Sequence, residues 1–431
     1  MSGVRVYNQR LLDLGLTLPG FVERSKVIAS LPSLGLLTIA AYTPENWKIE
    51  YLEIDEISEY KIEKIIEDKP DLIAISSLTA RITDAYNLSS KFRKAGLKVA
   101  IGGLHASALP DEAMKFADTV IQGEGEIIWQ DLIKDFENQE LKPLYSSKAN
   151  RKFNFQFSDF KMPRYDLLDI SKYNRLTIQT TRGCPLDCIF CGASRMISTY
   201  KKKPILQVEK ELNKILEIWE NPFIELADDN TFVDKSWSIE LLTLFNKYRI
   251  KWFTETDISI AENKKILELL SSSNCAQLLI GLESSAPESL LGIDKNNWKF
   301  KQFDTYRKKI DTIQSFGVSV NGCFILGFDS DTEESFKNTD DFIKSTNLTE
   351  VQLTMLTPFP GTYLYDKFQQ EGRLLEDNNW SKFTLFDLTF KPKNMSVAEF
   401  EFAFENLMQS TYTSSELSKR RNTFKTVIKN R

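Results

Sequence analysis

Strand-like and helix-like segments alternate along nearly the whole chain, and this alternation is the feature that most restricts its fold. Short apolar runs of strand length recur, with amphipathic stretches of helical period between them. Strands that alternate with helices predict parallel sheets, because each helix carries the chain back to the start of the next strand. The alternation is interrupted by a polar stretch at Asn138–Pro163. The sequence therefore predicts an α/β protein with two parallel sheets, since 431 residues exceed one ordinary core.

The first block of alternation predicts a doubly wound, mostly parallel sheet. Its strands are expected at Trp47–Asp55, Asp71–Leu78, Lys98–Gly103 and Thr119–Gly123. In such sheets the ligand binds beyond the carboxyl ends of the strands. Small or polar residues occupy three of these ends, namely Ser76, Ser77 and Thr79, then Gly102 and Gly103, then Gly123 and Glu124. We therefore expect one binding rim at this edge of the sheet.

The second block predicts six strand–helix units, enough for a partial barrel. Its strands are expected at Arg175–Thr181, Pro222–Ala227, Lys251–Thr256, Gln277–Glu283, Ser319–Gly327 and Glu350–Thr357. Stretches of helical period separate them. The chain after about residue 365 is less regular, and its basic end, Lys419–Arg431, is expected to be a solvated helix or tail.

Composition narrows the classes of function. A net charge of -5 argues against a general nucleic-acid binder, which is usually basic. No apolar run approaches the roughly 18 residues of a membrane span, and the N-terminus lacks a signal-peptide pattern, so we expect a cytoplasmic protein. The chain has five cysteines and one histidine, His105. Histidine-based catalysis is therefore nearly excluded, and the difficult chemistry must come from a cofactor.

Cys184, Cys188 and Cys191 lie within eight positions of one another. Thiolates hold iron–sulfur clusters, and these spacings let one loop present three sulfurs to one cluster. Three thiolates on a four-iron cluster leave one iron open to chelate an amino and a carboxylate group. The alternative is a structural zinc site, which normally takes four protein ligands. Cys275 and Cys323 lie in apolar segments typical of inert buried thiols, so the pattern favours the cluster.

This loop resembles the radical S-adenosylmethionine (SAM) signature Cys-x-x-x-Cys-x-aromatic-Cys, with Phe190 as the aromatic residue. The resemblance covers about Arg175–Tyr365. It implies a 4Fe-4S cluster whose reduced form cleaves SAM to a 5′-deoxyadenosyl radical, and an external reducing partner such as flavodoxin or ferredoxin. It also implies a partial (β/α)6 barrel, in agreement with the six predicted units.

Two further motifs are similar to SAM-binding elements of that superfamily. Glu225–Phe232 is similar to the strand-end motif near the methionine amino group, which makes Asp228 and Asp229 candidate SAM contacts. Adjacent acids suit a cationic ligand, although a helix N-cap explains them as well. Ile280–Ser285 resembles the strand near the ribose or methionine, which makes Glu283 a candidate. A solvated strand end is the alternative for Glu283.

A doubly wound domain before such a loop resembles the cobalamin-binding subgroup, which includes the anaerobic magnesium-protoporphyrin ester cyclase and hopanoid methylases. Ser76–Thr79 and Gly102–Gly103 look like the elements that cradle the nucleotide tail of cobalamin, and Gly123–Glu126 is similar to another recurring element. The Asp-x-His-x-x-Gly loop that supplies the cobalt ligand in many corrinoid proteins is absent. We expect cobalamin nonetheless, and for His105 either a hydrogen bond near the cofactor tail or a purely local loop role rather than cobalt ligation.

Two stretches precede the first predicted strand. Leu31–Leu37 looks like the first helix of this domain in the subgroup. Leu16–Arg24 contains Pro and Gly, which is typical of a loop. Arg24 could bind an anionic group of a substrate or cofactor, or form a surface salt bridge.

The expected domains are a cobalamin-binding-like domain at 1–140, a linker at 141–170, the radical SAM barrel at 171–365 and a C-terminal helical extension at 366–431. The predicted function is a radical SAM enzyme that modifies a small-molecule or lipid substrate, by cobalamin-dependent methylation or another carbon-centred reaction. Three alternatives stay open: a cobalamin-independent radical SAM enzyme for cyclisation or rearrangement, a non-catalytic iron–sulfur or corrinoid carrier, and a methylthiotransferase acting on RNA. The acidic balance disfavours the last of these.

Overall fold

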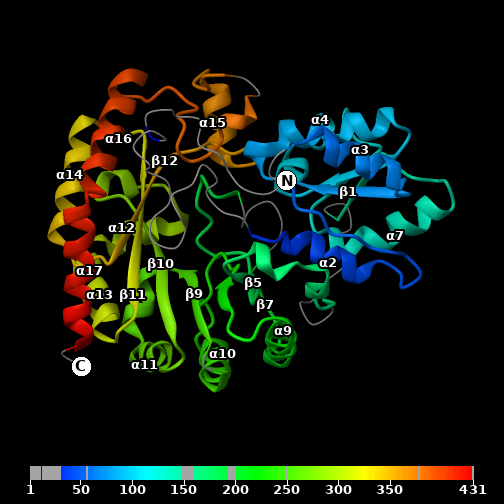
Figure 1. Ribbon diagram of the computed structural model, residues 1–431. Coiled ribbons are helices and arrows are strands. Elements are labelled where there is room, and N and C mark those ends of the chain that lie inside the picture. The colour runs from blue at the N-terminus through cyan, green and yellow to red at the C-terminus, as the bar shows by residue number, and fades with distance from the viewer. Residues whose placement is uncertain are drawn as a thin grey trace.

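The computed structural model describes residue 11 and residues 31–54, 57–147, 160–192, 200–248, 250–376 and 379–429. Leu16–Arg24 and part of the expected linker lie outside these residues. Two parallel sheets organise the described chain, one of four strands and one of six (Figure 1). The α/β class expected from the sequence is confirmed.

The N-terminal sheet has the strand order β1-β2-β3-β4. Its strands are β1 (Leu72–Ser76), β2 (Lys98–Gly102), β3 (Thr119–Gln122) and β4 (Leu144–Ser146). Its helices are α2 (Leu34–Tyr42), α3 (Glu59–Asp68), α4 (Ile82–Lys94), α5 (Leu104–Ala108), α6 (Pro110–Ala113) and α7 (Gly125–Glu137). Successive side chains of a strand point to opposite faces. In β2, Val99 and Ile101 pack with α3 and α4, whereas Ala100 packs with α2 and α7, so helices cover both faces as in a doubly wound sheet.

Two sequence expectations for this block are wrong. Trp47–Asp55 was expected as a strand, but its described part, residues 47–54, is irregular. Its alternating side chains make separate contacts instead: the Trp47 indole donates to Glu137 Oε1 (2.9 Å), and the Tyr51 hydroxyl accepts from Ser33 N (2.7 Å). The fourth strand is β4, inside the stretch expected to be strand-poor, and it pairs with β3. A strand of three residues is too short to show a period in the sequence.

The central sheet has six parallel strands in the order β12-β11-β10-β9-β8-β5, as the six predicted units required. The strands are β5 (Leu176–Ile178), β8 (Phe223–Leu226), β9 (Lys251–Thr256), β10 (Cys275–Glu283), β11 (Ser319–Leu326) and β12 (Glu350–Met355). The helices between them include α9 (Ile205–Ile218), α10 (Lys235–Tyr248), α11 (Lys264–Ser272), α13 (Tyr306–Ser315) and α14 (Glu333–Ser345). Neighbours in sequence are neighbours in the sheet, which is the arrangement of a partial barrel.

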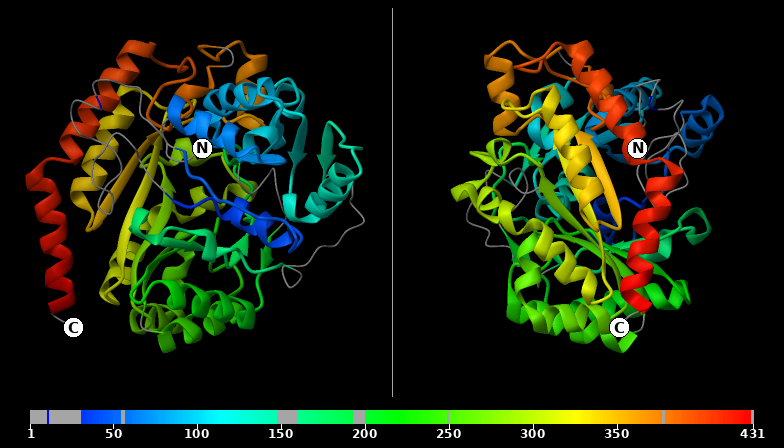
Figure 2. Two further views of the ribbon diagram at one scale, coloured as in Figure 1. Left: turned by 45° about the vertical axis from the view of Figure 1, so that its right-hand side comes forward. Right: turned by 90° about the vertical axis from the view of Figure 1, so that its left-hand side faces the viewer.

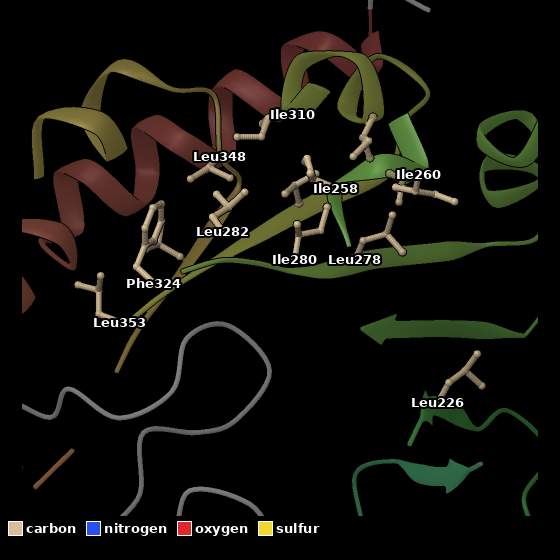
Figure 3. Close-up of a cluster of buried hydrophobic side chains, with 14 of the residues drawn as sticks. Leu226, Ile258, Ile260, Leu278, Ile280, Leu282, Ile310, Phe324, Leu348 and Leu353 are labelled. Carbon is tan, nitrogen blue, oxygen red and sulfur yellow. The ribbon is translucent and has the colours of Figure 1, made fainter. Parts of the chain in front are cut away.

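The outer face of the central sheet is apolar. Leu278, Ile280 and Leu282 alternate along β10 and belong to one large buried cluster. Figure 3 shows these side chains on the side where Ile258 and Ile310 lie. Burying the full side chain of such a residue contributes about 1.5–3 kcal/mol. This outer core holds the strands so that their other face is free to build a site.

The inner face is polar. The strand register aligns Glu255 of β9 with Leu279 of β10, and Leu279 with Asn321 of β11, so these three side chains share the inner face. Cys323 lies two residues further along β11 on the same face. Glu255 is exposed although strands flank it on both sides. Solvent therefore reaches the inside of the partial barrel.

The chain after the barrel forms α15 (Tyr363–Gln370), the short 3-10 helix η9 (Trp380–Lys382), α16 (Val397–Thr411) and α17 (Ser414–Lys429). Figures 1 and 2 show α17 at the outer edge of the barrel, far from the N-terminal sheet. Trp380 of η9 instead reaches the N-terminal domain, where its indole donates to Glu112 Oε1 (3.0 Å). None of the described helices combines the length and apolar character needed to cross a bilayer.

Candidate functional site

Cys184, Cys188 and Cys191 lie on a loop that follows β6 (Thr181–Arg182), a short strand paired antiparallel with β7 (Lys201–Lys202). Backbone hydrogen bonds hold this cysteine loop against two later segments of the chain. They run from Ile189 N to Ile293 O (2.9 Å), from Lys295 N to Leu186 O (2.9 Å) and from Leu364 N to Ile189 O (3.1 Å). The barrel thus fixes the path of the loop.

The three thiols are free of disulfides, and their charges act on one another. The pKa of the Cys188 thiol is raised, and burial is the largest cause. The charge of Lys299 lowers this pKa, whereas the charges of Cys184 and Cys191 raise it further. A thiolate buried in this way needs a positive partner, which iron supplies when bound. Among the described residues, no three Cys, His, Asp or Glu side chains converge as the ligands of a single metal ion do. Thiolates that bind different irons of one cluster lie further apart than the ligands of a single ion, and three of them on one loop are a donor set that suits such a cluster.

Asp228 is fully engaged within the protein. Its carboxylate accepts from Thr180 N (2.6 Å), Thr181 N (2.8 Å) and Thr231 Oγ1 (3.0 Å), and also from the Thr180 hydroxyl. Burial raises its pKa. Asp228 therefore ties the end of β8 to the segment that leads into the cysteine loop.

Asp229 contacts the loop itself, because Gly183 N donates to its Oδ2 over 2.7 Å. Gly183 has a φ of 83°, a left-handed conformation that favours glycine. The N-cap alternative for the acidic pair is wrong. The residue that accepts from the first turn of α10 is Asp234, whose Oδ1 lies 3.0 Å from Trp237 N.

Glu283 is buried at the end of β10 and is not a solvated strand end. Its Oε1 lies 2.8 Å from Lys299 Nζ, which also donates to Gly281 O over 2.8 Å. The carboxylate folds over Gly281, where an added Cβ would lie 2.3 Å from Oε1. Glu283 also has a φ of 65°, so the strand turns sharply there. A side chain at 281 would therefore displace the Glu283 carboxylate from its present position.

Lys299 and Asn230 are two site residues that sequence reasoning missed. Burial alone lowers the pKa of Lys299, but the charges of Glu283 and Cys188 outweigh it and raise the pKa overall. An ammonium group therefore lies near the cysteine loop. Asn230 Nδ2 lies 3.7 Å from Cys184 Sγ and donates to a second acceptor over 2.8 Å. Lys299 lies in a lysine-rich stretch that reads as surface, whereas Asn230 directly follows the acidic pair.

The rim of the N-terminal sheet is built from residues with little or no side chain. Ser76 pairs in register with Gly102, and Gly103 has a φ of 104°. A Cβ at Gly103 would lie 3.3 Å from Ser76 Oγ and 3.4 Å from Ser77 O. Ser77 and Thr79 are both buried. The ends of β1 and β2 therefore approach closely, and glycine at 103 lets the backbone pass this near to Ser76 and Ser77.

The third element of the rim contacts the cysteine loop. Gly123 has a φ of 90°, and its N donates to Ser107 Oγ (2.9 Å). Arg182 Nη1, two residues before Cys184, lies 2.9 Å from Glu124 Oε1 and 2.6 Å from Glu126 Oε1.

Lys201 Nζ lies 3.2 Å from Glu124 and completes what we call the Arg182 network, namely Arg182, Glu124, Glu126 and Lys201. Glu124 was expected as a cofactor contact, and the structure places it in this network between the two domains. Sequence reasoning did not identify Arg182, since an arginine beside a cysteine has no partner that the sequence reveals.

His105 is buried behind the rim. Its Nε2 lies 3.2 Å from Glu112 Oε1, and its ring centroid lies 4.9 Å from that of Trp380. His105 thus contacts both a neighbouring residue of its own domain and Trp380 of η9.

The comparisons with known families divide the chain as the fold does. The B12 binding domain family matches residues 24–133, and the radical SAM superfamily matches residues 178–343. The chain therefore carries a radical SAM domain behind an N-terminal B12-binding domain. These two domains confirm the expected cofactors, a 4Fe-4S cluster, SAM and cobalamin, and identify a radical SAM enzyme.

Relatives cover most of this radical SAM chain. Bacteriochlorophyllide d C-12(1)-methyltransferase of Chlorobaculum tepidum is 27% identical over 81% of this chain and 76% of its own length. Hopanoid C-2 methylase of Rhodopseudomonas palustris is 27% identical over 82% of this chain and 67% of its own. The anaerobic magnesium-protoporphyrin IX monomethyl ester cyclase of Rubrivivax gelatinosus is 21% identical over 87% of this chain and 72% of its own length.

Among solved structures, the radical SAM methyltransferase TsrM from Kitasatospora setae, with cobalamin and a [4Fe-4S] cluster bound, has the same fold. The TM-score is 0.70 at 14% identity, over 94% of this chain and 98% of TsrM. This agreement extends over both sheets and confirms the expected fold class.

Proposed function

We propose that this chain is a cobalamin-dependent radical SAM methyltransferase that modifies a carbon atom of a small molecule or lipid. The Arg182 network carries the proposal, because it joins the B12-binding rim to the cysteine loop through buried ion pairs. Methylation of an unactivated carbon requires both cofactors to reach one substrate, so their loops must keep a fixed relation. The methyltransferases and methylase among the relatives support the same reaction.

When bound, the cluster and SAM supply a 5′-deoxyadenosyl radical that removes a substrate hydrogen atom, and cobalamin supplies the methyl group. We assign Cys184, Cys188 and Cys191 as the iron ligands. The ring centroid of Phe190 lies 6.0 Å from that of Phe328, which anchors the loop between the second and third ligands. The proposed reductant is an external electron carrier such as flavodoxin or ferredoxin, and the proposed location is the cytoplasm.

The acidic residues of the site have different proposed roles. Asp229 uses Oδ2 for Gly183 N, and Oδ1 remains available for the amino group of SAM. Both carboxylate oxygens of Asp228 accept hydrogen bonds from donors inside the protein, so we propose that Asp228 positions the loop. Glu283 and Lys299 form an ion pair near Cys188, which suits the charged methionine part of SAM.

For cobalamin, we assign the small residues of the N-terminal rim to the nucleotide tail. These residues are Ser76, Ser77, Thr79, Gly102, Gly103 and Gly123. Glu124 holds the domains in register through Arg182. We propose the domain boundaries at residues 140, 170 and 365, as expected from the sequence.

We place the substrate against the open inner face of the barrel. Glu255 is exposed on this face, yet protein surrounds it closely enough that burial, followed by the charges of Glu225, Asp229 and Glu283, raises its pKa to about 8. A carboxyl group with this pKa is partly protonated near neutral pH. Glu255 can therefore either donate or accept a hydrogen bond when it orients a polar group of the substrate.

A labelling experiment tests the proposed reaction. Cells with and without the gene are fed methionine labelled with ¹³C in its methyl group, and their metabolites are compared by mass spectrometry. We expect a labelled product in the parent strain and, in the deletion strain, a precursor lighter by one methylene group. A deletion strain that instead accumulates a precursor with the same number of carbon atoms would favour cyclisation or rearrangement.

A further inference from the structure

A basic groove lies on the outer side of the cysteine loop. It is a cavity of about 320 Å³, lined among others by Pro185 and Leu186 of the loop and by Lys235, Lys295 and Lys301. All three lysines are exposed. Within the described part of the chain, no carboxylate forms an ion pair with any of them. The lining residues of the groove thus carry three positive charges and one negative charge, that of Asp257, which leaves a net charge of +2.

The groove is directly connected to the cysteine loop. Pro185 follows Cys184 in the chain, and Leu186 O accepts a hydrogen bond from Lys295 N over 2.9 Å. Asp257, the acidic residue that lines the groove, is engaged inside the protein, because Ser259 N donates to its Oδ1 (2.9 Å). A protein seated in the groove would thus lie against the segment between the first two cysteines.

The charge of the groove contrasts with that of the whole chain, whose net charge is -5. Helix stability does not explain Lys235, since it is the first residue of α10, where the helix dipole disfavours a cation. The segment that carries Lys295 and Lys301 also exposes Leu291 and Phe300. Exposed apolar side chains rimmed by polar residues mark protein interaction sites, and charge of one sign there selects a partner of opposite charge.

We propose that this groove docks the acidic electron carrier that reduces the cluster. The inference rests on the proposed function, which requires one electron from outside for each cleavage of SAM. One electron leaves the reduced carrier, which is oxidised by one electron, and enters the cluster, with no bond formed or broken. Opposite charges steer such an encounter and bring the carrier to the side of the protein where the cysteine loop reaches the surface.

The test compares two double variants that change the net charge equally. Lys235→Glu/Lys295→Glu reverses the charge of two lysines in the groove. Lys64→Glu/Lys393→Glu reverses the charge of two exposed lysines outside it. Flavodoxin is titrated by calorimetry into the anaerobically reconstituted protein at low ionic strength. We expect the groove variant to bind about tenfold or more weakly, with a smaller dependence on salt, and the control to stay within about twofold of the parent.

A kinetic measurement accompanies the titration. For each protein, the rate of 5′-deoxyadenosine formation with reduced flavodoxin is divided by the rate with dithionite, which needs no docking surface. The ratio should fall in the groove variant and not in the control. Lys301→Gln removes one charge with little change in size. It should also weaken flavodoxin binding and lower the rate ratio, but by less than the double groove variant does.

Two results would overturn the docking proposal: unchanged affinity and ratio in the groove variant, or an equal loss in the control. A parent protein that binds flavodoxin but forms no 5′-deoxyadenosine with dithionite would refute the proposed function instead. The affinity comparison then still decides whether the groove is the docking surface.

Discussion

Replacing Arg182 by methionine should weaken the whole protein, because this residue neutralises two buried carboxylates at once. Its side chain is 16% exposed, and those of Glu124 and Glu126 are 10% and 8% exposed. Removing one partner of a buried ion pair costs about 3–5 kcal/mol, mostly from the charge left behind. Lys201 still pairs with Glu124, whereas Glu126 loses its cation. We therefore expect a loss near the lower bound, about 3 kcal/mol of unfolding free energy.

The assay is urea unfolding followed by tryptophan fluorescence, and the chain offers a matched control. Arg164 lies 2.7 Å from Asp166, but the two side chains are 40% and 44% exposed. Arg164→Met should therefore cost less than about 1 kcal/mol. Adding Glu126→Gln to Arg182→Met should recover at least half of the loss, since the unpaired charge disappears. Equal losses for the two arginine variants, or no recovery, would refute the buried-network reasoning.

Three further predictions concern single residues. Glu255→Gln should leave stability unchanged at pH 4 and raise it by about 1–2 kcal/mol at pH 8.5 in thermal or urea unfolding. The reason is that the folded protein keeps a proton on Glu255 up to a pKa of about 8, above the ordinary 4.5, so the stability of the parent falls as pH rises between these values. The expected gain is smaller than the full pKa shift implies, because Glu255 is exposed to solvent. An equal difference in stability at both pH values would contradict this prediction. Asp228→Asn should lower the iron content of reconstituted protein, since the amide nitrogen in place of Oδ2 cannot accept from the hydroxyls of Thr180 and Thr231, and undiminished iron would refute the positioning role. Gly103→Ala should lower the cobalamin content, whereas Gly96→Ala, with a similar φ of 86° and open space around it, should not; equal cobalamin in both would speak against the assignment of this rim to cobalamin.

Much of the fold could be predicted from the sequence, because most of its strands and helices have a clear hydrophobic period. The six strands of the central sheet are apolar on one face and are separated by amphipathic helices, so their order followed from the chain alone. The strand expected at Trp47–Asp55 failed because alternation also arises where single side chains reach separate partners, as Trp47 reaches Glu137. The short β4 was missed for the opposite reason, since three residues carry no period.

The site was readable only in part, because sequence gives identity and spacing but not partners. The spacing of Cys184, Cys188 and Cys191 is enough to predict an iron–sulfur cluster. Asp228 and Asp229 look equivalent in sequence, yet one saturates both oxygens inside the protein and the other binds Gly183 N.

The contacts between domains were beyond the reach of sequence. Arg182 meets Glu124, 58 positions away in the chain, and only the packing of the two sheets brings them together. Lys299 was hidden for a similar reason, because its neighbours Lys295 and Lys301 are exposed and nothing in the sequence marks Lys299 as buried.

The central claim is that three thiolates hold a cluster whose remaining iron takes up SAM. Its most direct test is the amount of 5′-deoxyadenosine formed by anaerobically reconstituted protein with SAM and dithionite. We expect the parent and a Cys275→Ala variant, altered at a buried cysteine outside the loop, to form the product, and Cys188→Ala to form none. Product formation by Cys188→Ala at the parent rate, or none by the parent, would contradict it.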